Sequence, residues 1–362
     1  MTNVLIVAEA LFPSVRLCGV RQMEVLAERG TVRFEFAGYY RVRAAQLNRA
    51  DIVIFIRSSS NFEKILAQQA LEAGKQLAYV LDDDLFHVPV DFTGKEQYPA
   101  RLRENMRWFL GNCDVFLTPC RGLPEKYGPL TKHAELIDEP ATLSDRRPRK
   151  NQEKLTVGFA GSMDRTRDLN SILSGAIDRV MAEYGDRVTF EFFGGKPAIA
   201  EKYGFRHIPY TDSYERYCET MASLGWDIAL APMPETEFHR CKYHNKYVEY
   251  SGYGIPGIYS DCEPYSRAVR DGETGLLCPN TDEAWAAALR RLLDDAALRE
   301  RLAAACREEA ESRYSPERVA GDYFRVLTAH LSPKVPGEPV RCLRWKKWMY
   351  FLRRAAEKLK KA

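Results

Sequence analysis

The sequence predicts an α/β protein made of two domains, each built on a mainly parallel sheet. At 362 residues the chain is longer than one core usually serves, and its hydrophobic fraction of 45% is enough for two cores. Short apolar runs alternate with segments of helical period through most of the sequence. Strands and helices that alternate in this way are joined by crossover connections, which make neighbouring strands parallel.

The expected elements fall into two sets separated by a polar stretch. The first set has strands at 4–8, 32–36, 51–56, 77–81, 114–117 and 134–137, with helices at 62–73 and 101–110. The stretch 142–154 is polar and aperiodic, which is typical of a linker. The second set has strands at 156–160, 188–193, 206–208, 227–231, 257–259 and 275–277, with helices at 169–183, 213–224, 245–253, 263–270, 282–293 and 296–313.

These elements predict a domain at 1–150 and a second at 151–315, followed by a crossover helix at 316–335 and a tail at 336–362. Two such sheets are expected to face a cleft at their carboxyl edges, where ligands of open α/β sheets bind.

The net charge of +3 conceals an uneven distribution. Residues 341–362 carry nine lysines and arginines against the single acid Glu357, so the rest of the chain is acidic overall. An acidic body would repel phosphates, so no nucleic-acid partner is expected. Nine cysteines without a CxxC pair indicate reduced thiols in the cytoplasm and no metal site. We expect neither an export signal nor a membrane span, because no apolar stretch approaches ~20 residues.

Candidate chemistry is concentrated in the run FHRCKYHNKYVEYSGYGIP at 238–256. A helix that began near residue 242 would place Lys242, Lys246 and Glu249 on one face close to its amino terminus. There the lysines and the free N–H groups would attract a diphosphate, and the carboxylate could accept hydrogen bonds from ribose hydroxyls. The residues by themselves also allow a solvated face of paired charges.

A second polar group follows the fourth expected strand. Asp82, Asp83 and Asp84 come directly after the apolar run 77–81, at the strand end that would face the cleft. Within this group a D-x-D pattern would suit Mn²⁺ or Mg²⁺ through hard oxygen ligands. The alternative is the polar end of a strand.

The run at 238–256, followed by DGETGLL at 271–277, resembles the donor-binding half of retaining GT-B glycosyltransferases of the family-four type, the glycosyl transferases group 1. Glu249 matches the second glutamate of the family's E-x7-E element, which holds the nucleotide ribose. Cys241 stands where the first glutamate would be. The run is similar to a divergent branch with the pattern F-N-x-x-K-S-x-x-K-x-x-E-Y, in which His239 and Tyr243 replace Asn and Ser.

The resemblance extends to VGFAGSMDRTRD at 157–168. In the family this strand leads into a G-S loop that approaches the donor phosphates, here Gly161 and Ser162. A glycine lets the backbone come close, and Arg165 or Arg167 could pair with phosphate through two parallel hydrogen bonds.

The resemblance also assigns two more regions. Tyr210 lies where the family frames the nucleobase, although a turn ahead of the next helix explains it equally well. In the first domain, the segment 12–21 would be an acceptor-facing loop, in which Arg16 or Arg21 would meet an anionic acceptor; an ordinary surface loop is the alternative.

The resemblance implies two Rossmann-like domains facing a central cleft, the GT-B fold. It implies transfer of a sugar, with retention, from a nucleotide-sugar donor to a glycan or lipid-linked acceptor in the synthesis of a surface polysaccharide, lipopolysaccharide or another glycoconjugate. No metal or cofactor is expected, because Lys242, Lys246 and Arg165 would neutralise the leaving diphosphate, which makes Lys242 a catalytic candidate. Asp83 and Asp84 resemble an acidic element that would orient the acceptor hydroxyl or contact the donor sugar.

Two other functions remain open at this point. A nucleotide-sugar 2-epimerase would need carboxylates and a histidine in one cleft, and a catalytically degenerate binding module would explain Cys241.

The tail has a pattern of its own. In a helix, Trp345, Trp348, Leu352, Ala355 and Leu359 would form one apolar stripe opposite lysines and arginines. Residues 341–362 are therefore expected to bind the anionic inner face of the cytoplasmic membrane as a peripheral anchor. Packing of the tail on the acidic body is the alternative.

Overall fold

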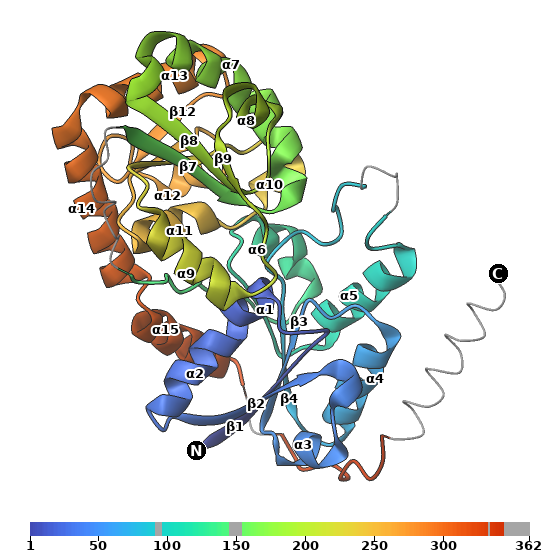
Figure 1. Ribbon diagram of the computed structural model, residues 1–362. Helices are drawn as coiled ribbons and strands as arrows, with labels where there is room; N and C mark the ends of the chain where they lie inside the picture. Colours follow the sequence, from blue (N-terminus) through green and yellow to red (C-terminus); the bar gives the residue numbers. More distant parts are fainter. Residues whose placement is uncertain (91–95, 145–153, 332–333, 344–362) are drawn as a thin grey trace. The chain divides into compact units, whose positions relative to one another are not determined.

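The computed structural model describes residues 1–90, 96–144, 154–331 and 334–343. The chain divides into two compact units. Unit 1 is Met1–Glu139 together with the segment that begins at Pro316, and unit 2 is Pro140–Ser315. Each unit has its own six-stranded parallel sheet flanked by helices (Figure 1), so the predicted fold class is confirmed. Every strand expected from the sequence is present, with bounds shifted by two residues or fewer.

The sheet of unit 1 has the strand order β2-β1-β3-β4-β5-β6. Its strands are β1 (Thr2–Ala8), β2 (Val32–Gly38), β3 (Ile52–Ile56), β4 (Gln76–Val80), β5 (Val115–Thr118) and β6 (Ala134–Leu136). Its helices are α1 (Pro13–Val15), α2 (Arg21–Glu28), α3 (Ala44–Arg49), α4 (Asn61–Glu72), α5 (Ala100–Asn112), α6 (Gly122–Tyr127) and α15 (Pro316–Ala329). The strand order reverses between β1 and β3, and ligands of such sheets bind at the carboxyl ends beside that point.

The segment 12–21 is helical rather than the loop expected from the sequence. A π-helical turn, Arg16–Val20, joins α1 to α2. Its apolar side packs on the sheet so closely that a Cβ on Gly19 would lie 2.6 Å from the Cδ1 atom of Ile56. Burial of this side provides the stabilisation that makes the segment helical. Helix α15, close to α2 in Figure 1, adds Tyr323 and Leu327 to the same core.

Residues 334–343 run along the amino edge of this sheet. The ammonium group of Lys334 lies 2.5 Å from a carboxylate oxygen of Asp114, just before β5. Val340 exchanges two hydrogen bonds with the Asn48 side chain at the end of α3, of 2.9 and 3.1 Å, and Leu343 is buried. The expected amphipathic helix within 341–362 falls, from residue 344 onward, outside the described residues.

The sheet of unit 2 has the strand order β12-β11-β10-β7-β8-β9, which reverses between β7 and β10. Its strands are β7 (Leu155–Gly161), β8 (Val188–Gly194), β9 (Arg206–Ile208), β10 (Ile228–Ala231), β11 (Gly257–Ser260) and β12 (Leu276–Cys278). Its helices are α7 (Thr166–Tyr184), α8 (Ala198–Tyr203), α9 (Tyr214–Leu224), α10 (Glu237–Arg240), α11 (Asn245–Gly252), α12 (Tyr265–Ala268), α13 (Asp282–Asp294) and α14 (Ala296–Arg313).

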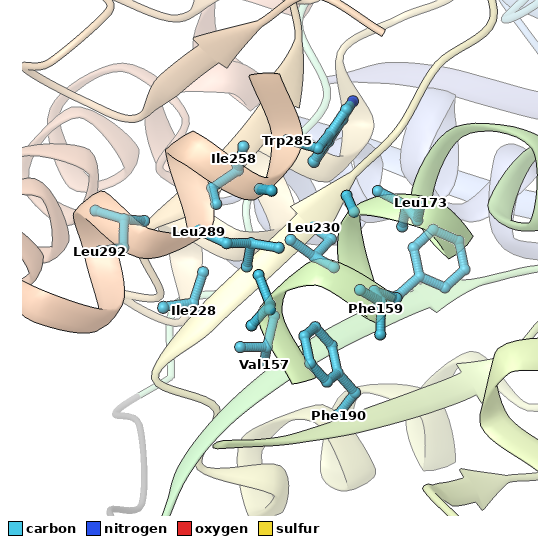
Figure 2. Close-up of a cluster of buried hydrophobic side chains, with 14 of the residues drawn as sticks. Val157, Phe159, Leu173, Phe190, Ile228, Leu230, Ile258, Trp285, Leu289 and Leu292 are labelled. Carbon is cyan, nitrogen blue, oxygen red and sulfur yellow. The ribbon is translucent and has the colours of Figure 1, made fainter. Parts of the chain in front are cut away.

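The core of unit 2 fixes the strands that border this reversal. In Figure 2, Leu289 of α13 lies in the same cluster of side chains as Val157 of β7 and Leu230 of β10, and all three are fully buried. Helices α7 and α13 pack against each other. Leu169, Leu173 and Ile177, spaced four apart along α7, are buried in this core. The ends of β7 and β10 are therefore held in place by a packed core, which suits them to carry a binding site.

Candidate functional site

The carboxyl ends of β7 and β10 are joined by Arg165. Its Nη2 atom donates to the carbonyl oxygen of Pro232 at 2.9 Å, and its Nη1 atom lies 3.3 Å from Oδ2 of Asp168. Arg165 follows β7 and Pro232 follows β10, so the guanidinium lies where the strand order reverses. Both terminal nitrogens of the guanidinium are thereby held in place, and its positive charge lies where ligands of parallel sheets bind.

Gly161 and Ser162 form the turn between β7 and Arg165. The carbonyl oxygen of Gly161 accepts a hydrogen bond of 3.1 Å from the N–H of Gly195. A Cβ on Gly161 would lie 2.6 Å from the Phe159 ring, and a Cβ on Gly194 only 1.9 Å from that same carbonyl oxygen. Gly194 also has a φ of +90°. The close approach of the two strand ends therefore requires glycine at 194. The sequence reading did not single out Gly194, although the pair Gly194-Gly195 at a strand end was its signal.

Tyr210 lies beside the same loops. It follows β9, is 45% exposed, and its Cδ2 atom would be 3.7 Å from a Cβ on Gly194. The structure thus brings an accessible aromatic ring to the ends of β8 and β9, where a flat ligand could stack on it.

Glu249 and Lys246 lie on α11 and contact each other directly. The Lys246 ammonium is 2.9 and 3.1 Å from the two carboxylate oxygens of Glu249. Both side chains are about one-fifth exposed. The pair is therefore partly shielded from water while remaining open on one side, which distinguishes it from a fully solvated ion pair.

Tyr217 of α9 completes this group. Its hydroxyl donates to Oε1 of Glu249 at 2.5 Å and accepts from Lys246 at 3.0 Å. Burial, followed by the negative charge of Glu249, raises the pKa of Tyr217 well above its usual value, so the phenol stays protonated and can donate. The Tyr217 ring stacks on Phe193 at the end of β8, with centroids 4.9 Å apart. Tyr217 was not predicted, because it lies 32 residues from Glu249 in the chain.

Lys242 does not share a helical face with Lys246 and Glu249, so that expectation is wrong. Helix α11 begins at Asn245, because His244 has a ψ of 45° and bonds through its imidazole to the hydroxyl of Tyr314 at 3.0 Å. The Lys242 ammonium instead lies 4.4 Å from the centre of the Phe238 ring. Its positive charge acts to lower the pKa of Asp168 and that of His239, which places Lys242 on the Arg165 side of the site.

In unit 1 another arginine, Arg57, lies after β3 at the point where the strand order of that sheet reverses. Its Nη1 atom lies 3.1 Å from Oγ of Ser14, after β1, and 3.1 Å from Oδ2 of Asp82, after β4. Among the described residues, Arg57 is the single non-glycine residue with a positive φ, of 54°. Such a backbone conformation is strained and persists where the surroundings hold it, often at functional positions. Arg57 was also missed from the sequence.

Asp83 and Asp84 follow β4, as expected. Asp84 is completely buried. Its carboxylate accepts hydrogen bonds from Lys126 at 2.8 Å and Tyr127 at 2.5 Å, both on α6, and lies 3.0 Å from Nδ1 of His87. Burial acts to raise the pKa of Asp84, but these three partners outweigh it and hold the pKa below the ordinary value. Asp84 is therefore an ionised group that anchors α6 to the strand end, and Asp83 is half-buried beside it.

Within the described ranges, no three or more His, Cys, Asp or Glu side chains gather in a way that would hold a metal ion.

Comparison with known proteins identifies the second half of the chain. Residues 154–295 match the family described as Glycosyl transferases group 1, which confirms the resemblance for this part. The chain is also 32% identical over 175 residues to a phosphatidyl-myo-inositol mannosyltransferase of Mycobacterium leprae (strain TN). That match covers 47% of this chain and 46% of the relative, so the chain spans about half the length of the curated relative that it matches.

Solved structures extend the likeness to the whole fold. Alr3699/HepE of Anabaena, solved in complex with UDP-glucose, has a TM-score of 0.65 at 12% identity, covering 91% of this chain and 100% of the other. Sucrose-phosphate synthase from Thermosynechococcus elongatus has a TM-score of 0.61 at 14% identity with the same coverage. At this identity the likeness concerns the fold, and the chain has the GT-B fold of two Rossmann-like domains.

Proposed function

We propose that this chain, whose residues 154–295 form a glycosyl transferases group 1 domain, is a glycosyltransferase that moves a sugar from a nucleotide-sugar donor to a glycan or lipid-linked acceptor. Unit 2 binds the donor and unit 1 binds the acceptor. The reaction retains the anomeric configuration and serves the synthesis of a surface polysaccharide or another glycoconjugate.

The observation that carries this proposal is the set of charges at the carboxyl edge of the unit 2 sheet. Arg165 is fixed across the β7 and β10 ends, and the charge of Lys242 lies nearby. Together they present positive charge to a diphosphate, and they stabilise the negative charge that develops on it as it leaves. Sugar transfer from a nucleotide sugar generates this charge, so no metal is needed to balance it.

Glu249 and Tyr210 fit the two remaining parts of a nucleotide. The Glu249 carboxylate, held by Lys246 and Tyr217, can accept hydrogen bonds from ribose hydroxyls, since each oxygen has more than one lone pair. The exposed Tyr210 ring can stack on the base. The group held at Gly161 and Ser162 is the diphosphate, because glycine lets it approach the backbone.

On the acceptor side we assign Asp83 to the acceptor hydroxyl. Asp84 acts through its bonds to α6, which hold the strand end in place. Arg57 positions Asp82 and the Ser14 hydroxyl at the same edge of the unit 1 sheet.

We also propose that the basic segment 341–362 holds the enzyme at the inner face of the cytoplasmic membrane, where lipid-linked acceptors are found. Across the part of the chain that the structure describes, no helix has the length and hydropathy that crossing a bilayer requires.

The function is tested by incubating the protein with a panel of nucleotide sugars in the presence and absence of EDTA and measuring nucleoside diphosphate release. We expect release from one donor that is insensitive to EDTA. It should fall about tenfold to a hundredfold in Glu249→Ala, which removes the carboxylate assigned to the ribose, and in Lys246→Ala, which removes the ion pair that orients this carboxylate. Lys202→Ala, which removes an exposed lysine on α8 paired with Asp178, is the matched control.

The same assay separates the alternatives. A 2-epimerase would convert the nucleotide sugar into its 2-epimer with no net release of nucleoside diphosphate, and a degenerate binding module would bind the nucleotide sugar and leave it unchanged. Wild-type turnover in both Lys246→Ala and Glu249→Ala would remove these residues from the donor site.

A further inference from the structure

His239 lies in the short helix α10 within the charged group that surrounds Arg165. The side chain of Thr236 caps this helix and accepts a hydrogen bond of 3.3 Å from the N–H of His239. The same Thr236 oxygen lies 2.7 Å from Nδ1 of His239. The imidazole also meets the Phe238 ring edge to face, with centroids 5.4 Å apart. These contacts fix the orientation of the ring.

The contact with Thr236 serves both protonation states of His239. A threonine hydroxyl can donate to a neutral Nδ1 or accept from a protonated one by rotating about its C–O bond. When the hydroxyl donates to Nδ1, the proton of the neutral imidazole is on Nε2. Among the hydrogen bonds of the described residues, none involves Nε2 of His239. His239 can therefore gain a proton without losing its bond to Thr236, and Nε2 remains available as a donor.

The charges around His239 hold it neutral. Burial, then the positive charge of Arg165, then that of Lys242, lowers its pKa to about 4, while Asp164 acts in the opposite direction. Arg165 comes from the loop after β7 and Lys242 from the segment after α10, so cations reach the imidazole from two different elements. Lys242 and His239 both contact the Phe238 ring, which keeps the two side chains together.

We propose that His239 is a third donor to the diphosphate of the nucleotide sugar, beside Arg165 and Lys242, and that it takes up a proton from solvent when this anion binds. This rests on the proposed donor site in unit 2. The neutral imidazole limits repulsion among the three groups while the site is empty. The bound dianion then reverses the local charge balance, which favours the imidazolium. No bond other than the N–H bond forms, and the proton comes from the buffer.

The first test measures the protonation of His239 directly by NMR of the imidazole nitrogens. Inorganic sulfate is the probe, because it stays a dianion over the whole range from pH 4 to pH 8 and does not itself take up a proton. In chloride buffer the pKa of His239 should be well below that of an exposed histidine. Saturating sulfate should raise it by about one unit or more. His330 in unit 1, which pairs with Glu135, is the internal control and should not respond in the same way.

Variants separate charge effects from structural ones. Lys242→Gln removes one of the two cations, so we expect the pKa of His239 to rise in the absence of any anion. Lys202→Gln, on the exposed side of α8, should leave it unchanged. His239→Asn should keep the fold and weaken binding of the nucleotide sugar, and proton uptake on binding, measured by calorimetry in buffers of different ionisation enthalpy, should disappear.

The outcomes distinguish this inference from the proposed function. If sulfate leaves the pKa of His239 unchanged, or changes it and that of His330 alike, the inference is overturned. If no nucleotide sugar of the panel binds while sulfate raises the pKa of His239, the anion site stands and the donor class is wrong. If any nucleotide sugar of the panel is turned over without proton uptake at His239, the function stands and the role of His239 is rejected.

Discussion

Arg165 donates to the carbonyl oxygen of Pro232, and this bond ties together the loops that follow two adjacent parallel strands of unit 2. Unit 1 repeats the relationship with different residues, because Arg57 after β3 bonds to the Ser14 side chain after β1. In both units an arginine therefore spans the point where the strand order reverses. A planar guanidinium with several donors can bond to two loops at once, which a lysine cannot do with the same geometry.

The contact between Gly194 and Gly161 predicts a large effect of a single methyl group. Gly194→Ala would place a Cβ 1.9 Å from the Gly161 carbonyl oxygen and would force alanine into a φ of +90°. We expect urea denaturation to show unit 2 destabilised by about 2–4 kcal/mol, and nucleotide-sugar binding to weaken because the turn at Gly161 must shift.

Gly204→Ala is the matched control for this change. Gly204 has a φ of +65°, but a Cβ there would meet nothing within 4 Å. It should therefore lose only about 1 kcal/mol from backbone strain. Equal losses in the two variants would contradict the close approach of the strand ends.

Tyr217→Phe removes one of the donors that hold the Glu249 carboxylate. Lys246 remains, so the fold should persist, with a loss of about 1 kcal/mol in the free energy of unfolding. Since Glu249 is less well oriented, we expect KM for the donor to rise about fivefold to thirtyfold with a smaller change in kcat. Tyr203→Phe, whose hydroxyl bonds to Asp178 on the outer helices, is the control for steady-state kinetics. A KM unchanged in Tyr217→Phe would mean that Glu249 does not need this bond.

Glu139 predicts a pH dependence of stability in unit 1. Its carboxyl is 3% exposed and accepts a hydrogen bond of 3.0 Å from the Cys18 thiol. Burial raises its pKa to about 8 despite the bond from Cys18, and the charges of Asp82 and Asp83 add to the rise. Between the unfolded value of 4.5 and about 8 the folded state binds the extra proton, so the free energy of unfolding falls as pH rises through this range.

Glu139→Gln removes this dependence, because an amide does not titrate. At pH 4.5 the free energy of unfolding of the variant should equal that of the wild type or lie below it. At pH 7 it should be higher than that of the wild type by about 1–3 kcal/mol. Denaturant unfolding at several pH values measures the difference. A gap that stays constant from pH 4.5 to pH 8 would argue against a protonated Glu139 in the folded protein.

The basic tail predicts binding to anionic membranes. Its removal should begin at residue 344, because Val340 and Leu343 are buried and Val340 bonds to Asn48 in unit 1. We expect the variant lacking 344–362 to lose affinity for phosphatidylglycerol vesicles by about a hundredfold or more, since each basic residue near the surface contributes about 1 kcal/mol. Cosedimentation of this variant with the vesicles at the wild-type level would refute the anchor.

A second variant separates the two parts of that interaction. Replacement of Trp345 and Trp348 by serine keeps every positive charge of the tail. Binding that persists at low salt and vanishes at high salt would assign the tryptophans to the apolar part of the anchor.

Much of the fold could be predicted because its signals are local. Continuous apolar runs such as IVIFI at β3 are buried on both faces of a parallel sheet, and this burial leaves a clear pattern in the sequence. The segment 12–21 was misjudged because its helix is stabilised by packing on β3, and the residues that receive it are distant in the chain. Helix α11 begins at Asn245, as the helix expected at 245–253 does. The extension of that helix back to residue 242 was wrong, since His244 bonds to Tyr314, 70 residues away.

The sequence by itself determined the α/β class, the strands and the residue types available for a diphosphate and a ribose, because periodicity and motif spacing are properties of neighbouring residues. Only the tertiary structure decided which of these residues meet. It joined Arg165 to Pro232, placed Tyr217 on Glu249, and brought His239 within reach of the charge of Arg165. The physical reason is that hydrogen bonds and charges act through space over a few ångströms, whereas Arg165 and Pro232 are 67 residues apart along the chain and Tyr217 and Glu249 are 32 residues apart.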